Sequence, residues 1–401
     1  PAAYVLPADD ARPGPQAELL RVLQRQAVEV SRATAPFTVT LPAKKARSGD
    51  KPAEGAAKAA DKPAEGSAKA AEEKPKTETK TFPAGSYVIR MDQPYSRIAD
   101  ALLDHQYWSP NDPQKRPYDD TGWTFGELFN AQVVRVADAK VLDAPMERVS
   151  VVTVPSDITG TGAVFVVNND ADPSLLALRY RLKGATFDVA EEPFESAGKK
   201  FARGSFIIRN AQRADVQAAV RELSLQAHGV EAPSVKTHPV KAPRIGYIHT
   251  WLGTQDEGWW RMEFDRLQIP YDYISTQVVA KEASLNSKWD VLVFPPVGRG
   301  AQQIVAGMPM WRNPLPWKTT PLTPNIGKID STDDMRPGLG WSGLVHLEQF
   351  VREGGVLIVS EDTSTFANTF GMTPGLSVQA PTRLNAPGTV MRAKIVDGAS
   401  P

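Results

Sequence analysis

Side chains able to do acid–base or nucleophilic chemistry follow two short apolar runs of this chain. His249 follows the run at 245–248, and Ser360 and Glu361 follow the run at 356–359. Because ligands bind beyond the carboxyl ends of parallel strands, we expect these side chains at one edge of a sheet. A histidine, a hydroxyl and a carboxylate there form the outline of a hydrolytic site. The structural alternative is a set of turns or caps, since no G-x-S-x-G elbow surrounds Ser360.

Aromatic side chains accompany the same predicted edge and favour ligand binding as a further alternative. Trp251 follows His249 by two positions, and Trp259 lies on a predicted helix that begins after Thr254. Thr254 and Glu257 have the spacing of a capping box at the start of that helix. A pocket lined by such rings would hold a ligand without changing it. The candidate ligand-binding residues are therefore His249, Trp251, Trp259, Ser360 and Glu361.

Metal and phosphate sites lack their usual sequence patterns in this chain. The histidines are His105, His228, His238, His249 and His346, and none forms an H-x-x-E or H-E-x-x-H pair. Cysteine is absent, which removes disulfides, thiolate metal sites and cysteine nucleophiles. Neither G-x-x-x-x-G-K-[ST] nor G-x-G-x-x-G occurs. We expect no metal site and no cofactor within these residues.

The part of the chain that precedes the candidate residues contains an internal duplication. FPAGSYVIR at 82–90 and FARGSFIIR at 201–209 are variants of one phrase. A strand-like run, a leucine-rich helical stretch and a second strand-like run precede each phrase, and a helix-period run follows it. The same order of elements therefore occurs twice, which predicts duplicated α/β modules over residues 1–106 and 151–230.

The pattern changes from residue 244 onward. Apolar runs at 245–248, 289–294 and 356–359 are typical of buried strands, and helix-period stretches separate them. Strands that alternate with helices favour a parallel sheet with right-handed crossovers. We assign this domain to 244–401 and expect it to be truncated, because a strand-like run at 388–396 stops close to the C-terminus.

Three segments are predicted to connect or interrupt these domains. Residues 43–80 contain no Val, Ile, Leu, Met, Phe, Trp or Tyr, so they cannot offset their ordering entropy and are expected to be a disordered, low-complexity insertion. The corresponding phenylalanines are 45 positions apart in the first copy and 7 in the second, and the difference of 38 equals the length of this insertion. That match places the insertion in a hairpin-like connection. Residues 107–150, rich in proline and aromatic side chains, and 231–243 are predicted connections.

Charge and hydropathy restrict the partners. Lys+Arg and Asp+Glu both total 46, so no overall charge attracts nucleic acid, and we expect no such partner. No run approaches the roughly 18 apolar residues of a membrane span, and the N-terminus lacks the regions of a signal peptide. A strand-like run begins as early as Tyr4, so both ends are interpreted as cut from a longer polypeptide.

Five longer phrases carry a family resemblance. They are AYVLPADD at 3–10, FPAGSYVIRMDQPYSRIADALLDHQ at 82–106, KRPYDDTGWTF at 115–125, DEGWWRMEFDRLQIPY at 256–271 and GLGWSGLVHLEQFVREGGVLI at 338–358. Together they resemble the region downstream of the catalytic domain in large secreted bacterial zinc carboxypeptidases of the carboxypeptidase A type. The resemblance implies a secreted or periplasmic protein, an upstream peptidase domain that carries the zinc, and peptide or cell-wall material as a partner. No zinc ligand carries over, because no position here matches the H-x-x-E…H motif of that domain.

The section from about residue 244 also resembles the class I glutamine amidotransferase-like fold, a flavodoxin-like α/β sandwich. Amidotransferases of this class use a cysteine nucleophile, so the resemblance implies the fold while the missing cysteine excludes the reaction. The first hypothesis is therefore a non-catalytic accessory region that packs against the peptidase domain or positions peptide. The alternatives are a ligand-binding module and a hydrolase that uses His249, Ser360 and Glu361.

Overall fold

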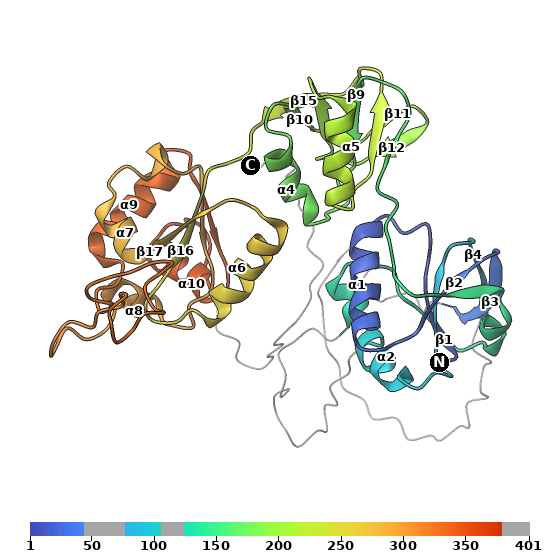
Figure 1. Ribbon diagram of the computed structural model, residues 1–401, viewed down its shortest axis with the longest axis horizontal. Helices are drawn as coiled ribbons and strands as arrows, with labels where there is room; N and C mark the ends of the chain where they lie inside the picture. Colours follow the sequence, from blue (N-terminus) through green and yellow to red (C-terminus); the bar gives the residue numbers. More distant parts are fainter. Residues whose placement is uncertain (44–76, 106–123, 379–401) are drawn as a thin grey trace, which may run out of the picture. The chain divides into compact units, whose positions relative to one another are not determined.

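The computed structural model describes residues 1–43, 77–105 and 124–378 (Figure 1). Contacts divide the chain into two compact units, one containing residues 1–154 and the other residues 155–384. Most of the predicted insertion, the start of the predicted connection 107–150 and the strand-like run 388–396 lie outside the described residues.

The first unit contains a five-stranded sheet with the order β6-β1-β5-β2-β7. Its strands are β1 (Ala3–Leu6), β2 (Val30–Ala33), β5 (Tyr87–Arg90), β6 (Val134–Val136) and β7 (Met146–Val149). The helices of this unit are α1 (Pro13–Arg25), α2 (Ser96–Leu103) and the short α3 (Phe125–Leu128), with a 3-10 turn η1 at Ala139–Asp143. β5 pairs antiparallel with both β1 and β2, so β1, α1 and β2 form a split β-α-β unit.

The sheet of the first unit is covered on both faces, which explains why β1 is apolar and buried at every position. Tyr4 and Leu6 of β1 pack with the helices on one face, while Ala3 and Val5 pack on the other face against a hairpin. This hairpin consists of β3 (Phe37–Pro42) and β4 (Thr77–Phe82). Figure 1 shows α1 and α2 on one side of the strands and the hairpin on the other. Because strand side chains alternate between faces, two cores require an apolar residue at each position.

The second sheet repeats the order of the first. It has the order β15-β10-β13-β9-β14-β8. Its first five strands, read in reverse as β14-β9-β13-β10-β15, match β6-β1-β5-β2-β7 strand for strand. Its strands are β8 (Ile158–Thr159), β9 (Val164–Val167), β10 (Thr186–Ala190), β13 (Phe206–Arg209), β14 (Ala227–Val230) and β15 (Thr237–Val240). Its helices are α4 (Ser174–Arg181) and α5 (Arg213–Glu222).

Each of the two sheets also carries a hairpin at the same place. β11 (Phe194–Ser196) pairs with β12 (Lys199–Phe201), as β3 pairs with β4. A phenylalanine pair closes each hairpin: Phe37 stacks on Phe82 with ring centroids 5.3 Å apart, and Phe194 stacks on Phe201 at 5.0 Å. These are the phenylalanines whose spacing placed the insertion in a hairpin.

The predicted insertion extends too far at its C-terminal end. Residues 77–80, expected to be disordered, form part of β4, and β4 pairs with β3 along its whole length from Thr77 to Phe82. The lack of apolar residues misled the prediction, because an exposed hairpin arm is stabilised by backbone pairing and by cross-strand contacts such as the hydrogen bond between Thr38 and Thr81.

Two predicted connections contribute strands instead. The described part of 107–150 contains β6 and β7, which pair with β1 and β2, and 231–243 contains β15, which pairs with β10. Both β7 and β15 are short edge strands of polar sequence, and β15 includes Pro239. Proline is tolerated in an edge strand because its missing N–H can be on the solvent side, where no neighbouring strand needs a hydrogen-bond donor. The proline that suggested a linker is therefore compatible with a strand.

The C-terminal part of the second unit contains an all-parallel sheet with the order β17-β16-β18-β19, as predicted. Its strands are β16 (Ile245–His249), β17 (Asp272–Ser275), β18 (Val291–Phe294) and β19 (Val356–Val359). The helical elements are α6 (Gln255–Leu267), α7 (Thr276–Lys281), η2 (Leu285–Ser287), α8 (Ala301–Ala306), α9 (Gly340–Arg352) and α10 (Asp362–Thr369). α7 and α9 pack on one face of the sheet and α6 on the other (Figure 1).

Two local expectations for this sheet were wrong. β19 was predicted to be a fully buried strand, but Val356 and Ile358 are exposed, because β19 is the edge strand of the described sheet and one of its faces is uncovered. Thr254 does precede α6, but its side chain makes no capping hydrogen bond. Glu257, the other half of the predicted capping box, is instead buried and turned toward Tyr273.

The second sheet and the parallel sheet share apolar packing within the second unit. One core cluster joins Leu178 and Leu182, in and directly after α4, to Tyr247 of β16 and Leu267 of α6. The hydroxyl of Tyr180 donates to the carbonyl of Pro243 across 2.7 Å. The contacts therefore place residues 155–230 and the described residues from 244 onward in one unit, where the sequence suggested separate domains.

Candidate functional site

The carboxyl edge of the parallel sheet positions the predicted candidate residues. The strand order reverses between β16 and β18, so the segments that follow these two strands leave in different directions. Open α/β sheets bind ligands at such a reversal. His249 is the last residue of β16 and pairs in register with Ser275 of β17. The segments after β16, β18 and β19 supply the other residues of this edge.

His249 is held by neighbours on every side. It is 2 % exposed and stacks on the ring of Tyr273, with centroids 4.2 Å apart and planes 6° from parallel. Its Nε2 atom lies 2.7 Å from Oδ2 of Asp330, and Nδ1 lies 3.4 Å from the carbonyl of Thr250. Both facing atoms are acceptors, so each ring nitrogen is directed at an acceptor. No hydrogen bond joins His249 to Ser360 among the described residues.

Trp251 continues the aromatic wall beside His249. The two rings meet edge to face at 4.9 Å, and Trp251 in turn lies 6.4 Å from Trp317. The indole Nε1 of Trp251 is buried and has no acceptor in the described part of the structure. A buried donor without a partner is uncommon, and water or ligand atoms supply the acceptor at many such sites.

The buried Glu257 and the half-buried Tyr273 form a polar pair next to His249. Glu257 is 3 % exposed, and its Oε1 accepts a short hydrogen bond from the hydroxyl of Tyr273. The carbonyl of Glu257 accepts from the hydroxyl of Tyr247 at 2.7 Å. The other carboxylate oxygen, Oε2, is buried without a partner among the described residues. Burial and the neighbouring Glu257 carboxylate raise the pKa of Tyr273 well above its ordinary value, so the phenol remains the donor.

Arg261 balances the charge of this pair from the same helix. Its guanidinium lies over the ring of Tyr273, 4.7 Å from the centroid. It also lies 3.8 Å from the carboxylate of Asp265. Glu257 and Arg261 are four residues apart on α6, so both side chains are directed to the same side of the helix. This spacing explains how one helix supplies both the carboxylate and the cation next to Tyr273.

The long segment between α8 and α9 brings Asp330 and Trp317 to the edge. Arg336 anchors it: this arginine is buried, is paired with Asp334 at 2.6 Å, and donates to the carbonyls of Met310, Trp311 and Arg312. Backbone bridges join Trp317 to Thr332 and Gly307 to Pro337. Segments of this length without regular structure are uncommon in compact domains unless they have a function.

Exposed tryptophans flank the edge. Trp259, in the first half of α6, is 64 % exposed, and Trp341, at the start of α9, is 71 % exposed. Trp311 and Trp317 on the long segment are also exposed. These four are all the tryptophans with high exposure in the described ranges. Trp259 is on the helix that follows β16, and the other three lie on the long segment and on α9, between β18 and β19 in the chain.

Ser360 and Glu361 lie in a turn that caps α10. The backbone N–H of Ser360 donates to the hydroxyl of Thr363 at 2.9 Å, and that hydroxyl also lies 2.7 Å from the carbonyl of Ser360. Glu361 has φ of 52° and precedes the helix. The next residue, Asp362, accepts from the backbone N–H groups of Val297 and Arg299. These contacts correspond to the turn-and-cap alternative for this segment.

Only part of the predicted set is thus brought together. His249 and Trp251 are in contact, Trp259 is exposed on α6, and Ser360 and Glu361 occupy the turn after β19. Sequence reasoning missed Glu257, Tyr273 and Asp330. Glu257 was attributed to a helix cap, and Asp330 lies in a segment without periodicity. The length of that segment and its Trp and Pro content were the signals that could have pointed to it.

The described ranges contain no evident metal site and no helix that could span a membrane. No group of three or more His, Asp or Glu side chains is close enough there to hold a metal ion. No helix within those ranges is both long and apolar enough to cross a bilayer. Comparison of the chain with family models, with curated proteins and with solved structures finds no match.

Proposed function

We propose that this chain is a non-catalytic accessory region of a secreted zinc carboxypeptidase-like metallopeptidase, and that its parallel-sheet domain binds and positions peptide. The observation that supports binding is the set of four exposed tryptophans around the carboxyl edge: Trp259, Trp311, Trp317 and Trp341. Large exposed rings are the anchors that protein and peptide interfaces use most. A carboxyl edge of this type is also where open α/β sheets bind ligands.

The fold part of the proposal depends on strand order. The order β17-β16-β18-β19 corresponds to 2-1-3-4, the first four positions of the flavodoxin-like order. This order supports the proposed class I glutamine amidotransferase-like architecture. The two sheets with matching order and matching hairpins likewise support an origin by duplication.

The position of His249 supports a binding role over a hydrolytic one. A general base needs a ring nitrogen within reach of the nucleophile. Both nitrogens of His249 face Asp330 and Thr250, and no hydrogen bond joins His249 to Ser360 among the described residues. The hydrolase alternative predicts that a serine-directed phosphonate labels Ser360. A covalent adduct on Ser360 would therefore replace the present proposal.

Peptide binding is testable by calorimetry with a short unstructured peptide that contains aromatic and aliphatic residues. Soluble peptidoglycan fragments form a parallel arm, because cell-wall material is the other proposed partner. We expect Trp259→Ala combined with Trp341→Ala to weaken peptide binding about tenfold or more, as expected for loss of two aromatic anchors. Leu176→Ala is the matched control, since Leu176 is an exposed apolar residue on α4. Unchanged affinity of the double variant would contradict the proposal.

A separate experiment tests the proposal that this chain is not catalytic. The peptide is incubated with the purified chain and zinc, and release of C-terminal residues is followed by mass spectrometry. We expect no zinc-dependent release. Activity from this chain alone that a chelator abolishes would show that the metal chemistry lies within it.

A further inference from the structure

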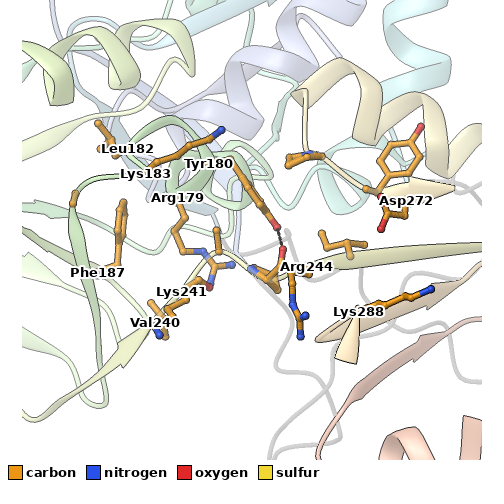
Figure 2. A pocket seen from close by; sticks show the side chains of 16 residues that line it. Arg179, Tyr180, Leu182, Lys183, Phe187, Val240, Lys241, Arg244, Asp272 and Lys288 are labelled. Carbon is orange, nitrogen blue, oxygen red and sulfur yellow. Dashed lines mark hydrogen bonds between the residues drawn. The ribbon is translucent and has the colours of Figure 1, made fainter. Parts of the chain in front are cut away.

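A second site lies at the opposite, amino-terminal end of the parallel strands. A groove of about 760 Å³ is lined there by residues of α4, β10 and β15 together with the starts of β16 and β17. Figure 2 shows Arg179 between Phe187 and Arg244, with Lys241 and Val240 beside it. All of these residues belong to the second unit. The groove is separate from the tryptophan-flanked edge, because it lies at the other end of the strands.

The groove carries an excess of positive charge. Its lining contains five basic side chains and one acidic side chain, Asp272. Two of the basic groups are neutralised outside the groove: Arg244 pairs with Asp290 at 2.7 Å, and Lys288 pairs with Glu282 at 2.5 Å. The remaining basic side chains, Arg179, Lys183 and Lys241, form no ion pair with any described carboxylate. This local excess contrasts with the balanced charge of the whole chain.

Arg179 is the least satisfied of these groups. It is half-buried, its Nη1 donates to the carbonyl of Lys241 at 2.8 Å, and its guanidinium lies 5.6 Å from the centroid of Phe206. Its Nε atom is buried with no acceptor within the described ranges. Burial also lowers the pKa of this arginine, because desolvation disfavours the charged form. A guanidinium in this position gains stability from an anion beside it.

The remaining walls of the groove are apolar. Leu182, Phe187 and Ile245 are buried and line it next to the basic side chains. A cavity with apolar walls and a few convergent charged groups is typical of a site for a small organic ligand. A hydrophilic ion alone would leave those walls unused.

We propose that this groove binds a small organic anion, whose carboxylate or phosphate group pairs with Arg179 and Lys241 while its apolar body lies against Phe187 and Ile245. The groove is independent of the proposed peptide-binding edge. Carboxylate and phosphate both accept paired hydrogen bonds from a guanidinium. The apolar walls of the groove are the reason to expect an organic anion and not a bare inorganic one.

The experiment is calorimetry on the whole chain with three matched aromatic probes and one inorganic probe. N-acetylphenylalanine tests the carboxylate source, phenyl phosphate tests the phosphate source, and N-acetylphenylalaninamide is the neutral counterpart of the first. Inorganic phosphate tests whether the apolar body matters. We expect at least one aromatic anion to bind, the neutral amide not to bind, and inorganic phosphate to bind more weakly than phenyl phosphate. Whichever aromatic anion binds more tightly assigns the source.

Variants then locate the binding. We expect Arg179→Gln to weaken the aromatic anion about tenfold or more, because a charge-assisted hydrogen bond contributes about 1.5–3 kcal/mol. Lys241→Gln should weaken it several-fold, and Lys200→Gln, an exposed lysine of β12, should leave it unchanged. If Arg179→Gln lowers the melting temperature, the affinity of Lys241→Gln tests the proposal instead. The Lys241 side chain is exposed, and its backbone carbonyl, which accepts from Arg179, is unchanged by the substitution.

Three outcomes would overturn the proposal. One is that neither aromatic anion binds, and another is that the neutral amide binds as tightly as its carboxylate. The third is that Arg179→Gln and Lys241→Gln both bind as the wild type does. The Trp259→Ala and Trp341→Ala double variant should bind the anion normally, so failure of the peptide proposal is distinguishable from failure of this one.

Discussion

At the scale of single residues, the carboxyl edge depends on buried polar groups that hold one another. His249, Tyr273 and Glu257 form a continuous stack of ring, ring and carboxylate, closed by Asp330 on the solvent side. Each polar atom that loses its partner here is left buried, which costs more than an exposed hydrogen bond is worth. The geometry of the edge is therefore sensitive to single hydroxyls and carboxylates.

Removal of the Tyr273 hydroxyl tests this dependence. Tyr273→Phe leaves the Glu257 carboxylate buried without its donor, and we expect the unfolding free energy to fall by about 1.5–3 kcal/mol. Tyr271→Phe is the matched control, because the Tyr271 hydroxyl donates at 2.6 Å to Asp265, whose side chain is 57 % exposed, and its loss should cost less than about 1 kcal/mol. Urea titration followed by tryptophan fluorescence measures both. Equal losses in the two variants would argue against a special role for the buried pair.

His228 predicts a pH dependence of the second sheet. Burial lowers the pKa of His228 from 6.5 to about 4. Below the ordinary value the unfolded chain therefore binds a proton that the folded chain does not, so stability falls as pH decreases from about 6.5 to about 4 and is unaffected by this group above that window. The loss is at most about 3 kcal/mol.

The substitution His228→Gln should flatten that dependence, since glutamine can still contact the Thr159 hydroxyl that faces the ring. The measurement is the melting temperature at pH values between 6.5 and 5, above the range in which most carboxylates titrate. His238→Gln, at an exposed position, is the control. A wild-type slope retained in His228→Gln would assign the pH dependence to other groups.

At the scale of elements, an irregular segment performs the positioning that strands and helices perform elsewhere. Asp330 and Trp317 come from the segment between α8 and α9, and hydrogen bonds from Arg336 hold that segment together. The nearby Asp334 carboxylate accepts from Arg336, and that contact holds the pKa of Asp334 well below its usual range. One buried arginine thus supplements the two short backbone bridges of a segment that has no helix or strand of its own.

We expect Arg336→Ala to loosen this segment while the sheets remain folded. The substitution removes donors to three backbone carbonyls and leaves Asp334 unpaired, so the free energy of local opening should fall by several kcal/mol. Limited proteolysis with mapping of the cut sites measures this change. Lys328→Ala, an exposed residue of the same segment, should leave the cutting rate unchanged. Faster cutting spread evenly over the chain would indicate global destabilisation instead.

At the scale of the whole molecule, the contacts define two units where the composition suggested three folded domains. The apolar cluster that joins Leu178 and Leu182 to Tyr247 and Leu267 lies on both sides of the predicted boundary at residue 243. Arg181 adds hydrogen bonds to the carbonyls of Leu267 and Gln268. Residues 155–384 therefore behave as one packing unit.

A pair of truncations tests the extent of this unit. We expect a chain of residues 155–384 to unfold cooperatively, at a melting temperature close to that of the same transition in the whole chain. A chain that begins at residue 244 should melt at a lower temperature, because truncation removes Leu178 and Leu182 from the apolar cluster that they share with Tyr247 and Leu267. Differential scanning calorimetry compares the two. Equal melting temperatures would support the three-domain interpretation.

Much of the fold was predictable because periodicity and repetition are local signals. The parallel sheet, the repeated order of strands and helices, and the hairpin closed by Phe37 and Phe82 all follow from side-chain patterns. The edge strands β7 and β15 were not predictable in the same way, since a polar four-residue strand exists only through pairing with its neighbour. Exposure of Val356 and Ile358 likewise depends on what covers β19, and no local pattern encodes that.

The same distinction between local and long-range features applies to the candidate sites. Sequence alone determined that His249 lies at the end of a strand, with Trp251 just beyond it, and that Ser360 follows another strand, because a strand end is a local feature. Only the tertiary structure decided that Glu257 turns inward to Tyr273, that Asp330 reaches His249 from a distant segment, and that the buried Nε atom of Arg179 has no acceptor among the described residues. The reason is physical: burial, hydrogen-bond partnership and charge compensation depend on residues far apart in the chain, which only the packed core brings together.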